Sequence, residues 1–312
     1  MSTARSEAEH EIRPDGVFVR QANRFTASFG EGPGQLPVEA GRYRLIVSPV
    51  CPWAHRALIV RRVLGLEDAI SLGVAHAARR PRGWEFADDP GGVDPVLGIR
   101  FLNEAYEATD PGYTGRATVP AVIDTVSGRV VHNDYHRLSI ELETAWAPLH
   151  APGAPDLYPQ DLRREIDALN DIVFREVNNG VYQAGFARSQ QAYESAYDMV
   201  FARLDDLERR LSGQRYLLGD RLTDADVRLF ATLVRFDAAY HGVFRLNRNR
   251  LTDFPALWGY ARDLYQTRGF GDTTSFDGIK RGYNLGSQAI NPFQIVSKGP
   301  DTSGWVTPHG RG

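Results

Sequence analysis

The order of apolar and polar positions predicts a strand, a helix and a second strand early in the chain. Branched and apolar residues alternate over Tyr43–Val47, as in a strand. Apolar residues then recur at helical spacing from Trp53 to Leu64, until Gly65 ends the run. Another apolar run near Ile70–Ala75 predicts a parallel partner strand, which gives a βαβ unit with the usual right-handed crossover.

The next segment, Arg79–Gly115, is rich in glycine, proline and aspartate but also in aromatic residues. We interpret it as a long, loop-rich insertion, a kind of segment that often carries function.

A β-hairpin and a helix are predicted after this insertion. Ala121–Asp124 and Val130-Val131 read as strands around a turn at Ser127-Gly128. An amphipathic helix towards Trp146 follows the capping residues Asn133-Asp134. The order βαβ and then ββα is that of a thioredoxin-like domain.

The second half of the chain reads as helical. Prolines concentrate at 148–159 and mark a linker, beyond which two apolar stripes at helical spacing end with Val177 and Leu211. Thr223 with Asp226 resembles a capping box that opens a further helix. We therefore predict an α/β thioredoxin-like N-terminal domain, 37–147, and an all-α C-terminal domain, 160–285, with an N-terminal extension, 1–36, and a C-terminal tail, 286–312. The stretch from Gly269 to Gly312 is expected to be mostly irregular.

Composition excludes several classes of protein. The net charge of −3 over 312 residues does not indicate the basic surface that binding of nucleic acid requires. No apolar stretch is long enough to span a bilayer, and Met1–Asp15 has no hydrophobic signal core, so a cytoplasmic protein is expected. The single cysteine, Cys51, excludes an intrachain disulfide and a thiolate zinc cluster.

Cys51 is the candidate nucleophile, because it falls on the strand-to-helix turn. Pro52 suits a first helical position, so the sulfur is expected beside unpaired backbone N–H groups at the helix start. These groups, together with His55 and Arg56, favour the thiolate, and cysteines in such places have pKa values of about 3.5–7.5 instead of about 8.5. The alternative is a small buried residue without a reactive role.

Other chemistry finds less support in the sequence. Ala54 stands where a dithiol oxidoreductase has its second cysteine, so an outside thiol must complete any redox cycle. His132 and His136 are four positions apart, but no third ligand is placed by spacing, and we expect no metal site. No motif of a serine hydrolase or of a phosphate-binding or dinucleotide-binding loop is present.

The chain resembles the glutathionyl-hydroquinone reductases, the Xi class of the glutathione transferase superfamily. The resemblance runs nearly end to end, through Phe18-Val19-Arg20-Gln21, Ala40-Gly41-Arg42-Tyr43, Cys51-Pro52-Trp53-Ala54-His55-Arg56, Gly65-Leu66-Glu67-Asp68, Asn178-Asn179-Gly180-Val181-Tyr182, Arg235-Phe236-Asp237 and Ile290-Asn291-Pro292. It implies that the cysteine attacks the sulfur of a glutathionyl-hydroquinone and that a second glutathione reduces the resulting mixed disulfide. It also implies a homodimer and no bound cofactor.

The resemblance assigns a thiol site and two tyrosines. Val119 would precede the cis-proline Pro120, whose backbone holds the peptide-like part of the thiol, and Trp84 and Arg116 match residues of the thiol site.

Tyr182 and Tyr283 match tyrosines near the hydroquinone, where a phenol could donate a proton to the leaving ring. Asn284 stands where the family has a further tyrosine, which weakens the match at Tyr283.

One departure concerns the thiol itself. Asp134-Tyr135 stands where the family has an acidic residue followed by serine, which grips the γ-glutamyl end of glutathione. We therefore hypothesise that the thiol could be mycothiol, which lacks that group and is used by some GC-rich actinobacteria. The scarcity of lysine, only Lys280 and Lys298, is compatible with a GC-rich genome.

Two alternatives stay open. A broader deglutathionylase or dehydroascorbate reductase, like the omega class, would share Cys51 but would not need the tyrosines. A ligand-binding protein that has kept the fold and lost the chemistry is the non-enzymatic alternative.

Overall fold

The chain passes more than once between two units in the computed structural model, which describes residues 11–286, 288 and 291–311. The thioredoxin-like unit consists of Gln21–Pro155 and the described part of Asp277–Gln294. The helical unit consists of 11–20, Asp156–Phe276 and 295–311. The predicted N-terminal extension is thus divided between the units, and its first ten residues, like Ile290, lie outside the described part.

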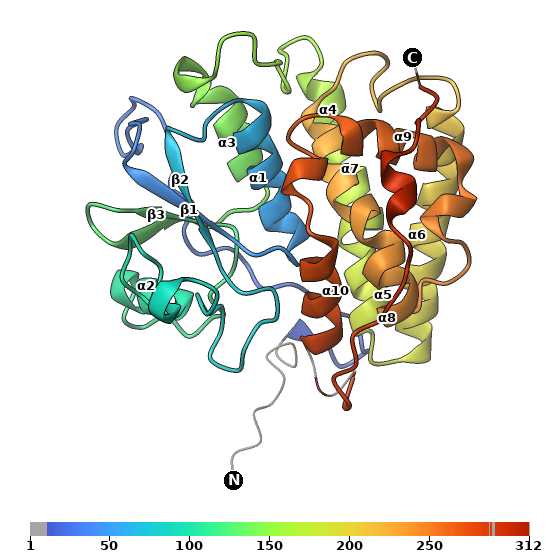
Figure 1. The fold of residues 1–312 in the computed structure, drawn as a ribbon, viewed down its shortest axis with the longest axis horizontal. Helices are drawn as coiled ribbons and strands as arrows, with labels where there is room; N and C mark the ends of the chain where they lie inside the picture. The colour runs from blue at the N-terminus through green and yellow to red at the C-terminus, as the bar shows by residue number, and fades with distance from the viewer. Residues whose placement is uncertain (1–10, 287, 289–290, 312) are drawn as a thin grey trace. The chain divides into compact units, whose positions relative to one another are not determined.

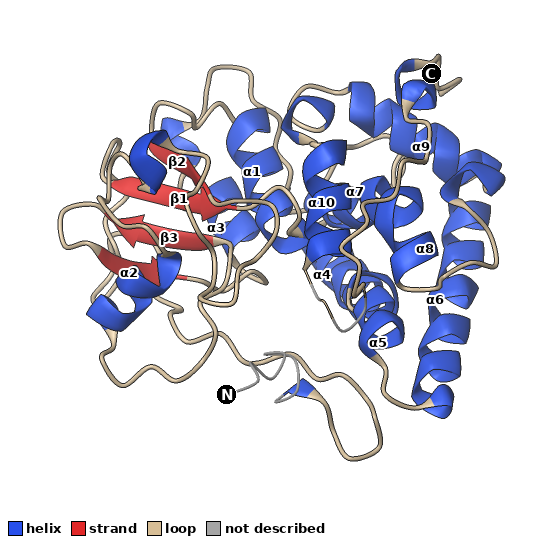
Figure 2. Ribbon diagram, turned by 60° about the horizontal axis from the view of Figure 1, so that its bottom comes forward, coloured by secondary structure: helices blue, strands red, loops and turns tan. Residues whose placement is uncertain are grey.

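A four-stranded sheet organises the thioredoxin-like unit. Its strands are β1 (Tyr43–Val47), β2 (Ile70–Val74), β3 (Ala121–Asp124) and β4 (Arg129–His132), in the order β2-β1-β3-β4. β1 pairs in parallel with β2 and antiparallel with β3, and β3 pairs antiparallel with β4 (Figure 2). Every residue of β1 and β3 is buried, so the two central strands belong to the core of this unit. The strands predicted from the hydrophobic pattern are confirmed.

Helices cover both faces of this sheet. α1 (Pro52–Val63) and α3 (Leu138–Thr144) pack on each other on one side, whereas α2 (Leu102–Thr109) lies on the other and contacts β4 (Figure 1). α2 falls inside the segment that we predicted to be a loop-rich insertion, so that interpretation is wrong for these residues. Glycines and prolines surround the helix but do not interrupt it.

A buried ion pair fastens the segment before α2 to the central strand. Nε and Nη2 of Arg44, on β1, donate to Oδ2 of Asp94 at 2.9 and 2.8 Å. Oδ1 of Asp94 accepts from the backbone N–H groups of Val96 and Leu97. Both charges are paired and hydrogen-bonded, and breaking such a pair from one side typically costs about 3–5 kcal/mol. The segment is therefore held in one conformation.

The helical unit is built around a helix that is buried over its whole length, α7 (Asp224–Arg235). α4 and α9 pack against it, and the bounds of the remaining elements are α4 (Arg163–Val173), α5 (Gly180–Phe186), α6 (Gln190–Leu211), α8 (His241–Val243), α9 (Pro255–Gln266) and two π-helical segments, Phe174–Asn178 and Phe236–Tyr240. Both predicted apolar stripes are confirmed as buried faces, on α4 with the π segment after it and on α6.

The stretch that we predicted to be mostly irregular contains a further helix. α10 (Phe276–Leu285) lies in a stretch that we predicted to have no regular structure from Gly269 onwards. Gly278 and Gly282 lower its helix propensity, which is why the pattern did not reveal it. Short 3₁₀ helices complete the described elements: Pro90–Gly92, Ala147–Leu149, Leu251–Asp253, Gly271–Thr273 and Ser303–Val306. No helix among the described residues combines the length and apolar character needed to cross a bilayer.

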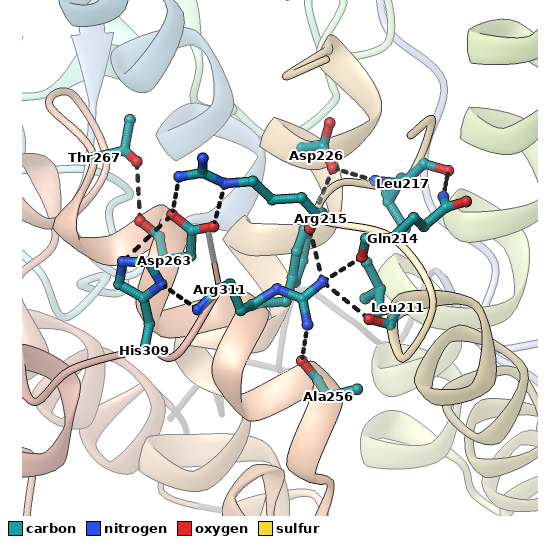
Figure 3. Close-up of polar contacts among 11 residues, drawn as sticks. Leu211, Gln214, Arg215, Leu217, Asp226, Ala256, Asp263, Thr267, His309 and Arg311 are labelled. Carbon is teal, nitrogen blue, oxygen red and sulfur yellow. Dashed lines mark hydrogen bonds and ion pairs between the residues drawn. The ribbon is translucent and has the colours of Figure 1, made fainter. Parts of the chain in front are cut away.

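The end of the chain is fastened to the helical unit by arginine. Arg311 donates through Nη2 to the carbonyl oxygens of Leu211, the last residue of α6, and of Gln214 and Arg215 in the loop that follows (Figure 3). Asp263, on α9, accepts from both Nε and Nη2 of Arg215. These contacts make the last described residues part of the unit.

A buried carboxylate fixes the start of α7. Oδ1 of Asp226 accepts from Leu217 N–H (Figure 3) and from the hydroxyl of Tyr260. Oδ2 accepts from Thr223 N–H and Oγ1. Burial raises the pKa of Asp226 to about 6, although the hydrogen bonds work in the opposite direction. The predicted capping box is confirmed.

Replacing Asp226 by alanine should lower the free energy of unfolding by about 3 kcal/mol or more at pH 4.5, because buried donors lose their acceptor. The loss should shrink by about 2 kcal/mol at pH 7.5. Since the pKa is raised on folding, the carboxyl group stabilises most when it is protonated, and this contribution fades as the pH rises towards 6. Urea unfolding at both pH values measures the effect. Asp220→Ala, at an exposed position, is the control, and equal losses in both variants would contradict the account.

Candidate active site

Cys51 lies at the N-cap of α1, directly before Pro52 in the first turn. Its carbonyl oxygen accepts the first helical hydrogen bond, from His55 N–H. Its side chain is 9% exposed, and Sγ donates to the carbonyl oxygen of Val119 at 3.3 Å. The strand-to-helix turn predicted for this cysteine is therefore confirmed, and the sulfur is placed at the positive end of a helix.

The loop opposite the sulfur carries the cis peptide that the resemblance implies. The bond between Val119 and Pro120 is cis, and Pro120 leads directly into β3. Both residues are buried. The Val119 carbonyl thus points at the cysteine, and the loop before Pro120 lies beside Cys51.

The two cationic neighbours on α1 are directed into the protein. His55 and Arg56 are both buried, and the guanidinium carbon of Arg56 lies 4.7 Å from the ring centroid of Trp53. This cation–π contact orients Arg56 along the first turn of the helix. That these two residues stabilise a thiolate on Cys51 stays a prediction.

Asp134 and Tyr135 lie in the turn that leads into α3. Oδ1 of Asp134 accepts from Nδ2 of Asn23 at 2.8 Å and from His136 N–H at 3.0 Å. Among the described residues, Oδ2 receives no hydrogen bond. Asp134 N–H donates to Nδ1 of His132, whose pKa burial lowers to about 4, so this imidazole is a neutral acceptor at neutral pH.

Tyr135 packs against Trp53, the aromatic residue two positions after the cysteine. Its ring centroid is 5.0 Å from that of Trp53, two residues after Cys51. The bulky phenol therefore packs on the start of α1, where a serine would leave space.

A second group of residues surrounds Trp84. Trp84 is buried, and the guanidinium carbon of Arg79 lies 5.9 Å from the centroid of its ring system. Burial lowers the pKa of Arg79 to about 10, with a further contribution from the positive charge of Arg116. The backbone of Arg116 is fixed by Gln21, which bonds both its N–H and its carbonyl. The structure thus brings the charges of Arg79 and Arg116 near each other, with Arg79 beside Trp84.

Sequence reasoning missed Arg79. The signal available was an arginine shortly before Trp84, but in an arginine-rich chain such a residue reads as a solvated surface charge.

Tyr283 is half-buried on α10, and the residue before it touches the loop that carries the cysteine. A Cβ atom placed on Gly282 would come within 2.3 Å of Val50 Cβ and 2.9 Å of the carbonyl oxygen of Ala77. Only glycine permits this approach of α10 to the residue preceding Cys51.

Tyr182 belongs to the helical unit. It lies on α5, is 7% exposed, and has Phe186, Tyr240 and Phe244 as ring neighbours. The remaining predicted site residues, from Cys51 to Tyr135 and Tyr283, belong to the thioredoxin-like unit.

Comparison with known proteins defines the class of this chain. Residues 50–145 match the family described as "Glutathione S-transferase, N-terminal domain", and residues 190–263 match "Glutathione S-transferase, C-terminal domain". The chain therefore contains the two domains of a glutathione S-transferase.

Individual relatives define the class more closely. Glutathionyl-hydroquinone reductase YqjG of Escherichia coli is 42% identical over 308 residues, covering 95% of this chain and 92% of that protein. Its structure with bound glutathione has a TM-score of 0.86 at 41% identity, covering 95% of this chain and 97% of that one. The Xi glutathione S-transferase of Phanerochaete chrysosporium has a TM-score of 0.88 at 41% identity, with 93% and 94% covered.

A glutathione transferase from Gordonia bronchialis has a TM-score of 0.87 at 56% identity, with 88% of this chain and 86% of that one covered. The chain belongs to the glutathionyl-hydroquinone reductases, the Xi class of the glutathione S-transferase family of enzymes. The resemblance inferred from the sequence is confirmed.

Replacing Gly282 by alanine should lower the free energy of unfolding by about 1–3 kcal/mol, because the new Cβ overlaps Val50. Combining it with Val50→Ala should recover at least about 1 kcal/mol relative to the sum of the single losses, as expected for residues in contact. Urea unfolding of the four chains of this cycle measures the coupling.

Gly242→Ala is the matched control, since a Cβ on this helical glycine meets no atom within 4 Å. Gly282→Ala with the stability of the wild type, or strictly additive losses in the cycle, would show that α10 does not press on the cysteine loop.

Proposed function

We propose that this protein is a thiol-dependent reductase that removes a glutathionyl or similar thiol group from S-conjugated hydroquinones. The observation that carries the proposal is the position of Cys51, the only cysteine of the chain, at a helix start and 3.3 Å from the carbonyl before a cis-proline. The chain belongs to a family that includes two proteins named glutathionyl-hydroquinone reductases, which are 42% and 41% identical to it. This membership supports the proposed substrate class.

The proposed cycle uses one cysteine and two thiol molecules. The Cys51 thiolate attacks the sulfur of the conjugate, an S–S bond forms, and the bond between sulfur and the ring carbon breaks. The electron pair of that bond stays on the ring carbon, which takes up a proton and leaves as the hydroquinone. A second thiol then attacks the mixed disulfide, and a low-molecular-weight disulfide departs while the Cys51 thiolate is restored.

The tyrosines and the thiol-site residues have proposed roles in this cycle. Tyr182 and Tyr283 are proposed proton donors to the leaving ring, because a phenol can act as a general acid. The backbone at Val119 and Pro120 is proposed to bind the peptide-like part of the thiol, and Trp84 to line its site.

Asp134 is proposed to bind the amino group of the thiol. Its Oδ2 receives no hydrogen bond from the described part of the chain, while Asn23 and His136 fix the carboxylate through Oδ1. An ammonium group is a natural partner for the remaining oxygen.

Glutathione is the proposed thiol, with mycothiol as the second candidate. Arg79, which lies beside Trp84, and the nearby charge of Arg116 favour a thiol that carries carboxylates, and a relative's structure contains glutathione. Tyr135 favours mycothiol, because this chain lacks the serine hydroxyl that would bind a γ-glutamyl group.

Replacing Cys51 by alanine should reduce turnover of glutathionyl-menadiol at least about a thousandfold, because no other cysteine can form the mixed disulfide. Release of menadiol, followed chromatographically, is the measurement. Calorimetry should show that Cys51→Ala still binds the free thiol, which separates lost chemistry from lost structure. Substantial turnover in the alanine variant would contradict the proposal.

Calorimetric titration of the wild type should give tighter binding of glutathione than of mycothiol. Tyr135→Ser should tighten glutathione binding about three- to tenfold, the worth of one added hydrogen bond, and leave mycothiol unaffected. Tyr135→Phe controls for loss of the phenol hydroxyl alone. Tighter binding of mycothiol by the wild type would establish the second candidate instead.

A further inference from the structure

Tyr182 lies beneath a half-buried cation, Arg20. The guanidinium carbon of Arg20 is 4.8 Å from the ring centroid of Tyr182 and 5.3 Å from that of Phe18. Nε and Nη2 of Arg20 are shielded from solvent, and both aromatic rings are buried. All three residues belong to the helical unit, Arg20 through the segment 11–20 that precedes the thioredoxin-like unit.

Three aromatic rings besides the guanidinium of Arg20 contact the ring of Tyr182. The ring centroids of Phe244, Phe186 and Tyr240 are 5.5, 5.8 and 6.0 Å away, and the absence of a side chain at Gly185 makes room for Phe244. Aromatic contacts from α5, from the second π-helical segment and from the residue after α8 thus hold the phenol. What Arg20 adds to this arrangement is a positive charge.

A cation at this distance affects how readily the phenol gives up its proton. The guanidinium is attracted to the neutral ring, but it is attracted more strongly to a ring that carries a full negative charge. Shielding from water strengthens this preference, because the effective dielectric constant is lower in the protein than in solvent. A cation over the ring of Tyr182 would therefore favour loss of the phenol proton, compared with aromatic neighbours alone.

We propose that Arg20 is a positioning residue whose charge, acting through Tyr182, promotes proton transfer to the ring that leaves the conjugate. The catalytic half of this proposal rests on the function proposed above. In the first step Tyr182 gives its proton to the ring carbon as the bond to sulfur breaks, and Arg20 stabilises the phenolate. The incoming thiol then returns a proton to the phenolate and becomes the thiolate that attacks the mixed disulfide.

The direct test measures the ionisation of Tyr182 in the full chain. Tyrosines labelled with ¹³C at Cζ report ionisation by NMR, and the Tyr182 signal is the one absent from Tyr182→Phe. In Arg20→Met the titration midpoint of this signal should rise by about one pH unit or more. Arg20→Lys, which keeps the charge, should recover most of the shift.

The matched control is Arg163→Met. The guanidinium carbon of Arg163 lies 5.0 Å from the ring centroid of another tyrosine, Tyr158, at an exposed position. This variant should leave the Tyr182 midpoint and the turnover unchanged. If Arg20→Met does not fold, Arg20→Gln removes the charge and keeps a planar polar end.

The second readout is turnover of glutathionyl-menadiol. Arg20→Met should lower kcat about tenfold with KM within about twofold, and should lower it no further when Tyr182 is already phenylalanine. An unchanged Tyr182 midpoint would overturn the proposal whatever the activity. A raised midpoint with unchanged kcat would overturn its catalytic half, and a wild type without turnover would contradict the proposed function together with that half.

Discussion

The contact between Cys51 and the loop before Pro120 is the constraint on which the proposed chemistry depends. Sγ of Cys51 and the carbonyl of Val119 are 68 residues apart in sequence and 3.3 Å apart in space. The sheet brings them together. β1 and β3 are antiparallel neighbours, with Ile46 opposite Ala121. The loop after β1 and the loop before β3 therefore lie at the same end of these two strands. Any change in this register would separate the sulfur from the cis-proline loop.

Distant parts of the chain complete the surroundings of the cysteine. α10 approaches the cysteine loop at Gly282, and the segment that carries Arg79 and Trp84 is tied to β1 by the buried pair of Arg44 and Asp94. Each of these attachments relies on a specific residue type: a glycine for close approach, and a fully hydrogen-bonded ion pair for a buried charge. The site is consequently assembled by long-range contacts around a short local motif.

This division explains what the sequence could and could not predict. The strands, the Cys51 turn and the capping box at Thr223 were readable because local periodicity and turn chemistry determine them. α2 and α10 were missed because glycines and prolines within or beside them mask the helical pattern, while tertiary packing stabilises the helices. The pairing of Arg79 with Trp84 and of Arg20 with Tyr182 could not be predicted, since nothing in local sequence indicates which of many arginines lies against an aromatic ring. The resemblance supplied candidate roles for the tyrosines but not the cation that lies over Tyr182.

The most direct test of the account is the intact mass of the pure protein after exposure to glutathionyl-menadiol in the absence of free thiol. The account predicts a single adduct of the mass of one glutathionyl group on the wild type, none on Cys51→Ala, and removal of the adduct by excess glutathione. An unmodified wild type, or the same adduct on Cys51→Ala, would contradict the claim that Cys51 takes the thiol group from the conjugate.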